Sequence, residues 1–216
     1  QYDSIMNYAF TKACLDYFAR ERFEAKQMAE KLSSNLMRNM EPVNRMMLNL
    51  LDSHDTHRFF SEVGENANRL MAALALEMVF PGAPCIYYGT EICTPGGYDP
   101  DSRRCFDWES VHWNREVFDK VIELTHIRST RAIADGEVEI FARDGMLGIR
   151  RKNDEECVIL YINMTGETLQ TREKAGKNFE ILSGNRADAA PLPADKGTYA
   201  AIRVEADGYI ILKIHL

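Results

Sequence analysis

The chain has 216 residues, of which 45% are hydrophobic and 27% are charged, and its formal net charge is −7. This length and apolar share predict a folded protein of one or two domains and exclude an intrinsically disordered chain. The negative charge argues against nucleic acid as a partner, since such binders gather Lys and Arg. No apolar run approaches the ~20 residues that cross a bilayer, so no membrane span is expected.

The cysteines predict a reducing compartment. There are five of them, their spacings are irregular, and no CxxC pair occurs, so neither a disulfide framework nor a zinc knuckle is indicated. The sequence also lacks a secretory signal. We therefore expect a cytoplasmic protein. Because the chain begins at Gln1 and not at Met, we also expect a further part upstream.

Short apolar runs alternate with helical patterns over residues 1–134. The nearly continuous run 46–51 is typical of a strand buried on both faces, as in a parallel sheet. Two shorter runs, at residues 4–8 and 85–88, also predict strands. Apolar residues at helical spacing predict helices in four stretches, at residues 10–18, 28–40, 70–78 and 117–131. This order indicates β/α units, whose functional loops follow the carboxyl ends of the strands.

The pattern of apolar residues changes after Asp135, and we expect a second, all-β domain over residues 135–216. Turn residues such as Asp144-Gly145 and Ser183-Gly184-Asn185 separate the runs of this part. Six strands are predicted, at residues 137–142, 146–151, 157–163, 178–182, 199–204 and 209–214. Strands in this number indicate a small antiparallel sandwich.

Polar residues follow the apolar run 46–51, in the order Asp52-Ser53-His54-Asp55-Thr56. At the mouth of a parallel sheet, a His-Asp pair can bind hydroxyl groups or stabilise positive charge. The alternative is a loop cap, because Asp and Ser often bind the free amides at the start of a helix. Spacing alone favours the loop cap.

A long Gly/Asp/Pro loop follows the run 85–88 and extends to about Arg104. Long loops in compact domains are often functional. Within it, Asp99 and Arg103 could hold sugar hydroxyls between them, the carboxylate accepting and the guanidinium donating. They could equally form a surface ion pair of little consequence.

Four segments resemble the α-amylase superfamily (glycoside hydrolase family 13), in order and in spacing. LLDSHDTHRF at residues 50–59 resembles its strand-seven signature, and GAPCIYYGTEI at residues 82–92 resembles its strand-eight signature. GGYDPDSRRCFDWE at residues 96–109 resembles the next loop of neopullulanases, cyclomaltodextrinases and maltogenic amylases. YDSIMNYAF at residues 2–10 resembles their strand-six segment. The resemblance covers essentially the whole chain.

The resemblance implies an α/β fold: the C-terminal part of a (β/α)8 TIM barrel, about strands six to eight, followed by an antiparallel β-sandwich domain. It implies a retaining α-glucan hydrolase that cleaves α-1,4 and in some members α-1,6 links. Cyclodextrin, pullulan and starch oligosaccharides are the expected substrates, and an α-glucan oligosaccharide is the expected partner. Retention requires a carboxylate nucleophile and a carboxylic acid roughly 5 Å apart.

Particular residues match the family's site. Asp55 falls on the third carboxylate, which stabilises the oxocarbenium-like transition state, and His54 falls on the histidine that binds the sugar in the cleavage subsite. Asp99 and Arg103 fall on the pair that contacts a glucose deeper in the donor cleft. Arg58 follows the pattern and is expected as a further substrate-binding residue.

One position departs from the family pattern. Many relatives carry Asp where this chain has Thr90, whereas the following Glu91 is retained and is expected to orient neighbouring groups. No cofactor or metal site is expected. Calcium is used by some full-length relatives, but no acidic cluster in this sequence has a calcium-ligand pattern.

In the family, the nucleophile and the general acid follow strands four and five, upstream of the segment that matches residues 2–10. We therefore expect this chain to lack both and to be inactive alone. A partial barrel also leaves strand edges and apolar surface open, which favours a homo-oligomer or a need for the missing half. The alternative function is a non-catalytic, amylase-like binding or assembly subunit.

Overall fold

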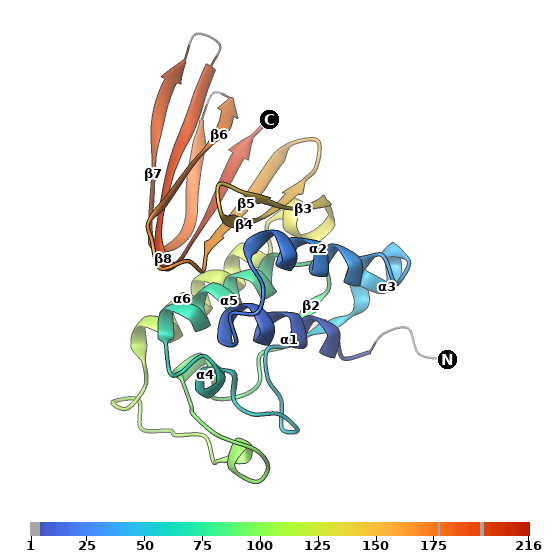
Figure 1. The fold of residues 1–216 in the computed structure, drawn as a ribbon, viewed down its shortest axis with the longest axis vertical. Coiled ribbons are helices and arrows are strands. Elements are labelled where there is room, and N and C mark those ends of the chain that lie inside the picture. Colours follow the sequence, from blue (N-terminus) through green and yellow to red (C-terminus); the bar gives the residue numbers. More distant parts are fainter. Residues whose placement is uncertain (1–4, 177, 195–196) are drawn as a thin grey trace.

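Helices and a β-sheet occupy separate parts of the molecule (Figure 1). The computed structural model describes residues 5–176, 178–194 and 197–216. The helices are α1 (Tyr8–Cys14), α2 (Ala25–Leu36), α3 (Glu41–Met46), α4 (Phe59–Glu62), α5 (Ala67–Val79), α6 (Arg115–Arg128) and α7 (Arg131–Asp135). The strands are β1 (Leu48–Asn49), β2 (Ala83–Pro84), β3 (Glu137–Arg143), β4 (Met146–Lys152), β5 (Glu156–Asn163), β6 (Leu169–Gly176), β7 (Phe179–Ala194) and β8 (Gly197–His215).

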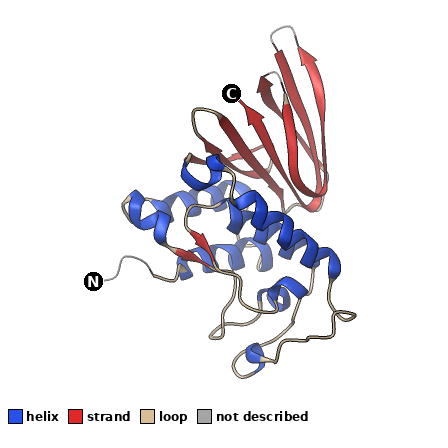
Figure 2. Cartoon of the chain, turned by 180° about the vertical axis from the view of Figure 1, so that it is seen from behind, coloured by secondary structure: helices blue, strands red, loops and turns tan. Residues whose placement is uncertain are grey.

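Three short parallel segments form the strand layer of the helical part. Met6 pairs with Leu48, and β1 pairs in parallel with β2, Leu48 opposite Ala83. Helices lie between these segments along the chain, as β/α units require (Figure 2). This arrangement, followed by a mostly antiparallel sheet, confirms the expected partial barrel and β-sandwich.

Buried amides clamp these three segments together. The Asn7 Nδ2 donates to Asn49 Oδ1 over 2.9 Å, and the Asn49 Nδ2 donates to the Pro81 carbonyl over 2.9 Å. The Asn49 side chain is fully buried, so both of its polar atoms need these partners. The same pair sets the register of the parallel segments.

The strands in this part are shorter than the sequence predicts. Of residues 46–51, only Leu48 and Asn49 pair, because α3 extends to Met46. The second strand is Ala83–Pro84, and not residues 85–88. The Cys85 N–H still donates to the Asn49 carbonyl over 2.7 Å, after which the chain leads into a 3-10 turn at Thr90–Ile92.

Helix α5 is the most deeply buried helix, with every residue from Leu70 to Val79 out of contact with solvent. A helix that is apolar all round belongs inside a core. Its one charged residue in that stretch is Glu77, and burial raises the pKa of this carboxyl to about 8, although the Cys85 N–H donates to it.

None of the described helices combines the length and the hydropathy that crossing a lipid bilayer requires.

The strands of the β part are buried on two faces. Along β5, Val158, Leu160 and Ile162 join the core shared with the helices, whereas Ile159 and Tyr161 join a second core. Strand β8 pairs with β5 along residues 208–215 and with β6 along residues 198–204, while β7 pairs with both halves. The second core lies between the two halves.

Three predictions for this part were wrong. The runs 199–204 and 209–214 form one strand, β8, and the run 178–182 continues through a predicted turn to Ala194 as β7. Two register shifts in β7, between Ile181 and Ser183 and between Asn185 and Ala187, absorb that turn. Strand β6 was missed, because its buried Glu173 breaks the apolar alternation.

Glu173 is stabilised by donors from β3, β4 and β5, strands with which β6 does not pair within the described residues. Its carboxylate accepts hydrogen bonds from Arg143, Arg150 and the Tyr161 hydroxyl. A carboxylate with several charge-assisted hydrogen bonds can occupy a buried position that a lone one cannot.

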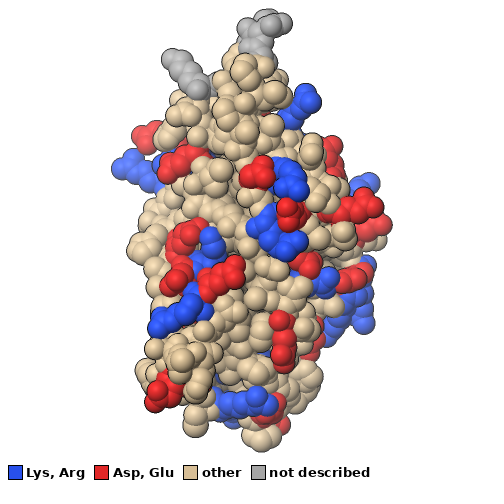
Figure 3. Space-filling view, turned by 90° about the vertical axis from the view of Figure 1, so that its left-hand side faces the viewer, with Lys and Arg blue, Asp and Glu red and all other residues tan. Residues whose placement is uncertain are grey.

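On the outer face shown in Figure 3, Lys and Arg lie among Asp and Glu and form no continuous basic surface.

A buried arginine joins the two parts. Arg151, on β4, donates to the Val79 carbonyl at the end of α5 over 3.1 Å and to the Gly136 carbonyl over 3.0 Å. Burial lowers its pKa to about 10, which leaves it charged at neutral pH. Asp207 adds a second link, accepting from Asn66 over 2.9 Å and from Arg69 over 3.0 Å.

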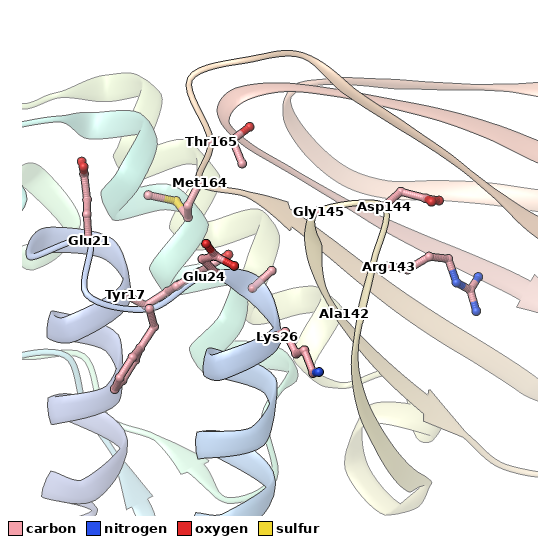
Figure 4. A pocket seen from close by; sticks show the side chains of 12 residues that line it. Tyr17, Glu21, Glu24, Lys26, Ala142, Arg143, Asp144, Gly145, Met164 and Thr165 are labelled. Atoms are coloured by element: carbon pink, nitrogen blue, oxygen red, sulfur yellow. The ribbon is translucent and has the colours of Figure 1, made fainter.

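A cavity of about 440 Å³ remains elsewhere along this junction (Figure 4). It lies between the start of α2, where Glu24 and Lys26 line it, and the turn that joins β3 to β4, where Asp144 lines it. The two parts therefore share an apolar core and polar links, and this cavity interrupts the junction at its α2 end.

Replacing Arg151 with Met tests the first link. The variant leaves the Val79 and Gly136 carbonyls without their charged donor, so we expect the free energy of unfolding to fall by about 2–3 kcal/mol. Urea unfolding at neutral pH measures it. Arg131→Met is the matched control, because the Arg131 side chain is 74% exposed, and we expect it to change the free energy by less than about 0.5 kcal/mol. Equal effects of the two variants would contradict the role of Arg151.

Candidate active site

Arg103 is the centre of a cluster at the carboxyl ends of the parallel segments. Its Nε lies 3.1 Å from Asp99 Oδ1 and donates to the His54 carbonyl over 3.1 Å. Its Nη2 donates to Asp55 Oδ1 over 3.5 Å, and the His54 Nε2 lies 3.3 Å from Asp55 Oδ2. The structure thus brings together four of the predicted residues, from the turn after β1 and from the loop after β2. Each of the four side chains is about half exposed.

A hydrogen-bonded turn holds His54 and Asp55 in place. The Ser53 N–H donates to Thr56 Oγ1 over 2.9 Å, and the Asp55 N–H donates to Ser53 Oγ over 3.2 Å. The Tyr8 hydroxyl, from the first turn of α1, lies 3.5 Å from the same Ser53 oxygen. Ser53 and Thr56 therefore act as the turn-capping residues, which leaves the Asp55 carboxylate free to face solvent.

Asp52, one residue ahead of this turn, binds a free amide at the start of α4 from outside the helix. Its buried carboxylate accepts from the Phe59 N–H at the start of α4 over 2.8 Å and from the Thr90 hydroxyl over 2.9 Å. Burial raises the pKa of Asp52, and these two donors and Arg58 oppose that rise. Thr90 thus supplies a donor where an Asp would place a second carboxylate against the first. This contact gives a physical reason for the departure noted at position 90.

Arg58 does not join the exposed cluster. It is fully buried, and its Nη1 donates to the Tyr88 carbonyl. Its guanidinium carbon lies 4.1 Å from the centre of the Tyr87 ring and 4.7 Å from that of Tyr88. Its backbone N–H donates to the Gly96 carbonyl over 3.0 Å, where the loop that carries Asp99 and Arg103 begins. Arg58 therefore joins the turn after β1 to that loop.

Gly96 is required at this junction. A Cβ there would lie 2.8 Å from the Asp101 carbonyl oxygen and 3.0 Å from the Arg58 Cγ. The loop then closes on itself, because the Gly97 N–H donates to Asp101 Oδ2 over 2.6 Å. The main chain of the loop is consequently fixed at its start.

Sequence reasoning missed two residues beside the cluster. The His57 Nδ1 lies 2.7 Å from Glu62 Oε1, and the His57 ring meets the Tyr98 ring edge-on, with centroids 4.5 Å apart. Both residues lie within the segments that resemble the family, but neither has a spacing that marks it. Their proximity to the cluster depends on the folding of two separate loops.

The cluster can bind a polyhydroxylated molecule. Carboxylate oxygens of Asp55 and Asp99 accept hydrogen bonds, whereas the Arg103 guanidinium donates them, and sugar hydroxyls do both. Within residues 5–176, 178–194 and 197–216, no group of three or more His, Cys, Asp or Glu side chains is arranged to hold a metal ion.

Comparisons with known proteins identify the family of the chain. The family model described as the catalytic domain of alpha amylase matches residues 1–135. The chain is 35% identical over 181 residues to a cyclomaltodextrinase of Thermoanaerobacter pseudethanolicus, a match that covers 82% of this chain and 32% of that protein. It is 34% identical over 193 residues to neopullulanase 2 of Thermoactinomyces vulgaris, covering 85% of this chain and 33% of that protein.

A solved structure shares the fold. The debranching enzyme of Nostoc punctiforme superimposes with a TM-score of 0.84 and 28% identity, covering 98% of this chain and 48% of that one. The chain spans about a third of the length of the curated relatives that it matches.

Replacing Thr90 with Val tests the buried contact beneath the cluster. The change removes a donor to the charged carboxylate, so the pKa of Asp52 rises further above its ordinary 3.8. When the pKa of a carboxyl is higher in the folded than in the unfolded protein, the folded protein loses stability as the pH rises from the unfolded-state pKa through the folded-state pKa. We therefore expect little loss near pH 4 and about 1–3 kcal/mol at pH 7, measured by urea unfolding. Thr90→Ser keeps the hydroxyl and is the control; a loss independent of pH would contradict the contact.

Proposed function

The chain belongs to the α-amylase family, and we propose that it forms part of a retaining hydrolase of α-glucans. The proposed substrates are cyclodextrins, pullulan or starch oligosaccharides, cleaved at α-1,4 links, with α-1,6 links as a further candidate. In this proposal residues 1–134 are the end of the catalytic barrel and residues 135–216 are the C-terminal β domain.

The observation that carries the proposal is the junction at Arg103. One guanidinium contacts Asp55, Asp99 and the His54 carbonyl, which come from two loops far apart in the sequence. An ordinary surface ion pair joins two residues and contributes little. A cluster of acceptors and donors at the carboxyl ends of parallel strands is where barrel enzymes bind their substrates.

Each residue then has a proposed role. Asp55 offsets the positive charge that develops at the sugar carbon in the oxocarbenium-like transition state. His54 donates to a hydroxyl of the sugar in the cleavage subsite, and Asp99 with Arg103 holds a neighbouring glucose unit. Arg58 is a positioning residue in place of the substrate contact expected from the sequence, because it is fully buried beneath the loop.

The proposed chemistry needs more than these residues supply. A retaining double displacement uses a nucleophile and an acid about 5–5.5 Å apart. In the family that the chain resembles, the nucleophile and the acid come from barrel units that precede the segment matching residues 2–10. The 216 residues are therefore proposed to bind sugar without hydrolysing it. A non-catalytic binding subunit is the second candidate, because the cluster alone already suffices for binding.

A cytoplasmic location is proposed from the cysteines. All five are free, and Cys14, Cys93 and Cys157 are buried as thiols. Free thiols persist in reducing compartments. Alkylation of freshly lysed cells followed by mass spectrometry tests this, and disulfide-linked peptides from the native protein would contradict it.

The 216-residue chain should bind maltotriose and leave β-cyclodextrin and pullulan intact. Saturation-transfer NMR measures binding, and release of reducing sugar measures hydrolysis. We expect Asp99→Asn and Arg103→Gln each to weaken binding about tenfold or more, since each removes a charge-assisted hydrogen bond. Asp154→Asn, on the exposed turn between β4 and β5, is the matched control and should bind as the unaltered chain does. Failure of the chain to bind, or unaltered binding by both cluster variants, would contradict the proposed site.

A further inference from the structure

Several exposed aromatic rings lie on segments that follow the parallel strands. In the described part of the chain, the Phe, Tyr and Trp residues that are more than a third exposed are Tyr8, Tyr88, Tyr98 and Trp108. Tyr8 follows the segment at residues 5–7, and the other three follow β2. All four therefore lie in segments that leave the carboxyl ends of the strands, where the Arg103 cluster is. Rings exposed on this side are accessible to a ligand, and the one that adjoins the Arg103 cluster is the candidate contact.

Tyr98 is the one of these rings that adjoins the cluster in sequence and in structure. It precedes Asp99, whose carboxylate lies 3.1 Å from the Arg103 Nε. The Tyr98 side chain is 68% exposed. Its backbone carbonyl accepts from the Asp101 N–H over 2.7 Å, which fixes the main chain on which the ring is mounted.

His57 fixes the ring itself. The His57 and Tyr98 rings meet at 85° with their centroids 4.5 Å apart, so His57 contacts one side of Tyr98 and leaves much of the ring uncovered. His57 is in turn held by Glu62, 2.7 Å from its Nδ1. A Tyr has only two side-chain torsions, and a ring that is already oriented loses little further freedom when a ligand covers it.

The chemistry that matches this arrangement is a pyranose ring. A glucose unit presents C–H groups on its faces and hydroxyls around its rim, so it needs an apolar plate and nearby hydrogen-bonding groups together. Tyr98 supplies the flat apolar surface of its ring. The nearby Asp99 accepts hydrogen bonds from sugar hydroxyls, and Arg103 donates them. Open-chain polyols have the hydroxyls but lack the ring face.

We propose that Tyr98 is a sugar-stacking, specificity-determining residue, which covers the face of the glucose unit whose hydroxyls Asp99 and Arg103 hold. This inference rests on the proposed function and deepens it: the cluster selects pyranose rings over other polyhydroxylated molecules. His57 and Glu62 act as positioning residues for the ring.

The test compares three variants of the full chain, with maltotriose as the probe, by saturation-transfer NMR titration. Tyr98→Ala removes the plate and should raise the dissociation constant about tenfold, the order expected for loss of one stacked ring. Tyr98→Phe keeps the plate and should bind within about twofold of the unaltered chain. Trp108→Ala removes a still more exposed ring, at 81%, from the same loop and should leave binding unchanged.

A second readout identifies the contact. In the unaltered chain, the ring protons of Tyr98 should show intermolecular NOEs to maltotriose C–H protons, and none to sorbitol at the same concentration. Circular dichroism before each titration confirms that the variants fold, as expected for an exposed side chain.

The outcomes separate this inference from the proposed function. If Asp99→Asn weakens binding whereas Tyr98→Ala does not, the sugar site stands and the stacking role of Tyr98 is overturned. If Trp108→Ala weakens binding as much as Tyr98→Ala does, the specific role of Tyr98 is likewise overturned. If the unaltered chain binds no maltotriose at all, the proposed function fails and this inference fails with it.

Discussion

The buried hydrogen bonds from Asn7 through Asn49 to the Pro81 carbonyl hold the helical part together. Main-chain pairing between the three parallel segments is short, so side-chain amides have to fix their register. A buried amide that loses its partner costs far more than an exposed one, which makes this arrangement specific. Every residue of the cluster depends on it, because His54, Asp55, Asp99 and Arg103 come together only if the segments before them end at one level.

The cluster also depends on groups that never reach the surface. Asp52 ties the start of α4 to Thr90, and Arg58 ties the same stretch of chain to the loop that begins at Gly96. The Asp52 carboxylate is buried and needs both of its donors, whereas the link from Arg58 to Gly96 is a main-chain hydrogen bond. Buried contacts thereby restrain the loops that carry the exposed residues, as the proposed binding of a sugar in one orientation requires.

Much of this was predictable from the sequence, for a physical reason. The β/α pattern predicts that loops at the carboxyl ends of the parallel strands share one edge, whereas spacing alone favoured a loop cap for residues 52–56, and the resemblance to the family singled out His54, Asp55, Asp99 and Arg103. The depth of a side chain is not encoded in this way. Arg58 was expected to contact substrate and is buried, and Tyr98 gave no signal because its partner His57 lies on another loop. In the β part, alternation found the strands that face an apolar core but missed β6, whose inward Glu173 relies on arginines from other strands.

In the proposed function, Asp55 is the residue of this chain that acts on the transition state itself. The most direct measurement is the turnover of β-cyclodextrin by the native gene product and by its Asp55→Asn variant. We expect the native product to hydrolyse the substrate and the variant to lose about 10²–10³-fold in kcat, the usual effect of removing one charge-stabilising group, with a much smaller change in KM. A native product without turnover, or a variant that retains the native kcat, would contradict it.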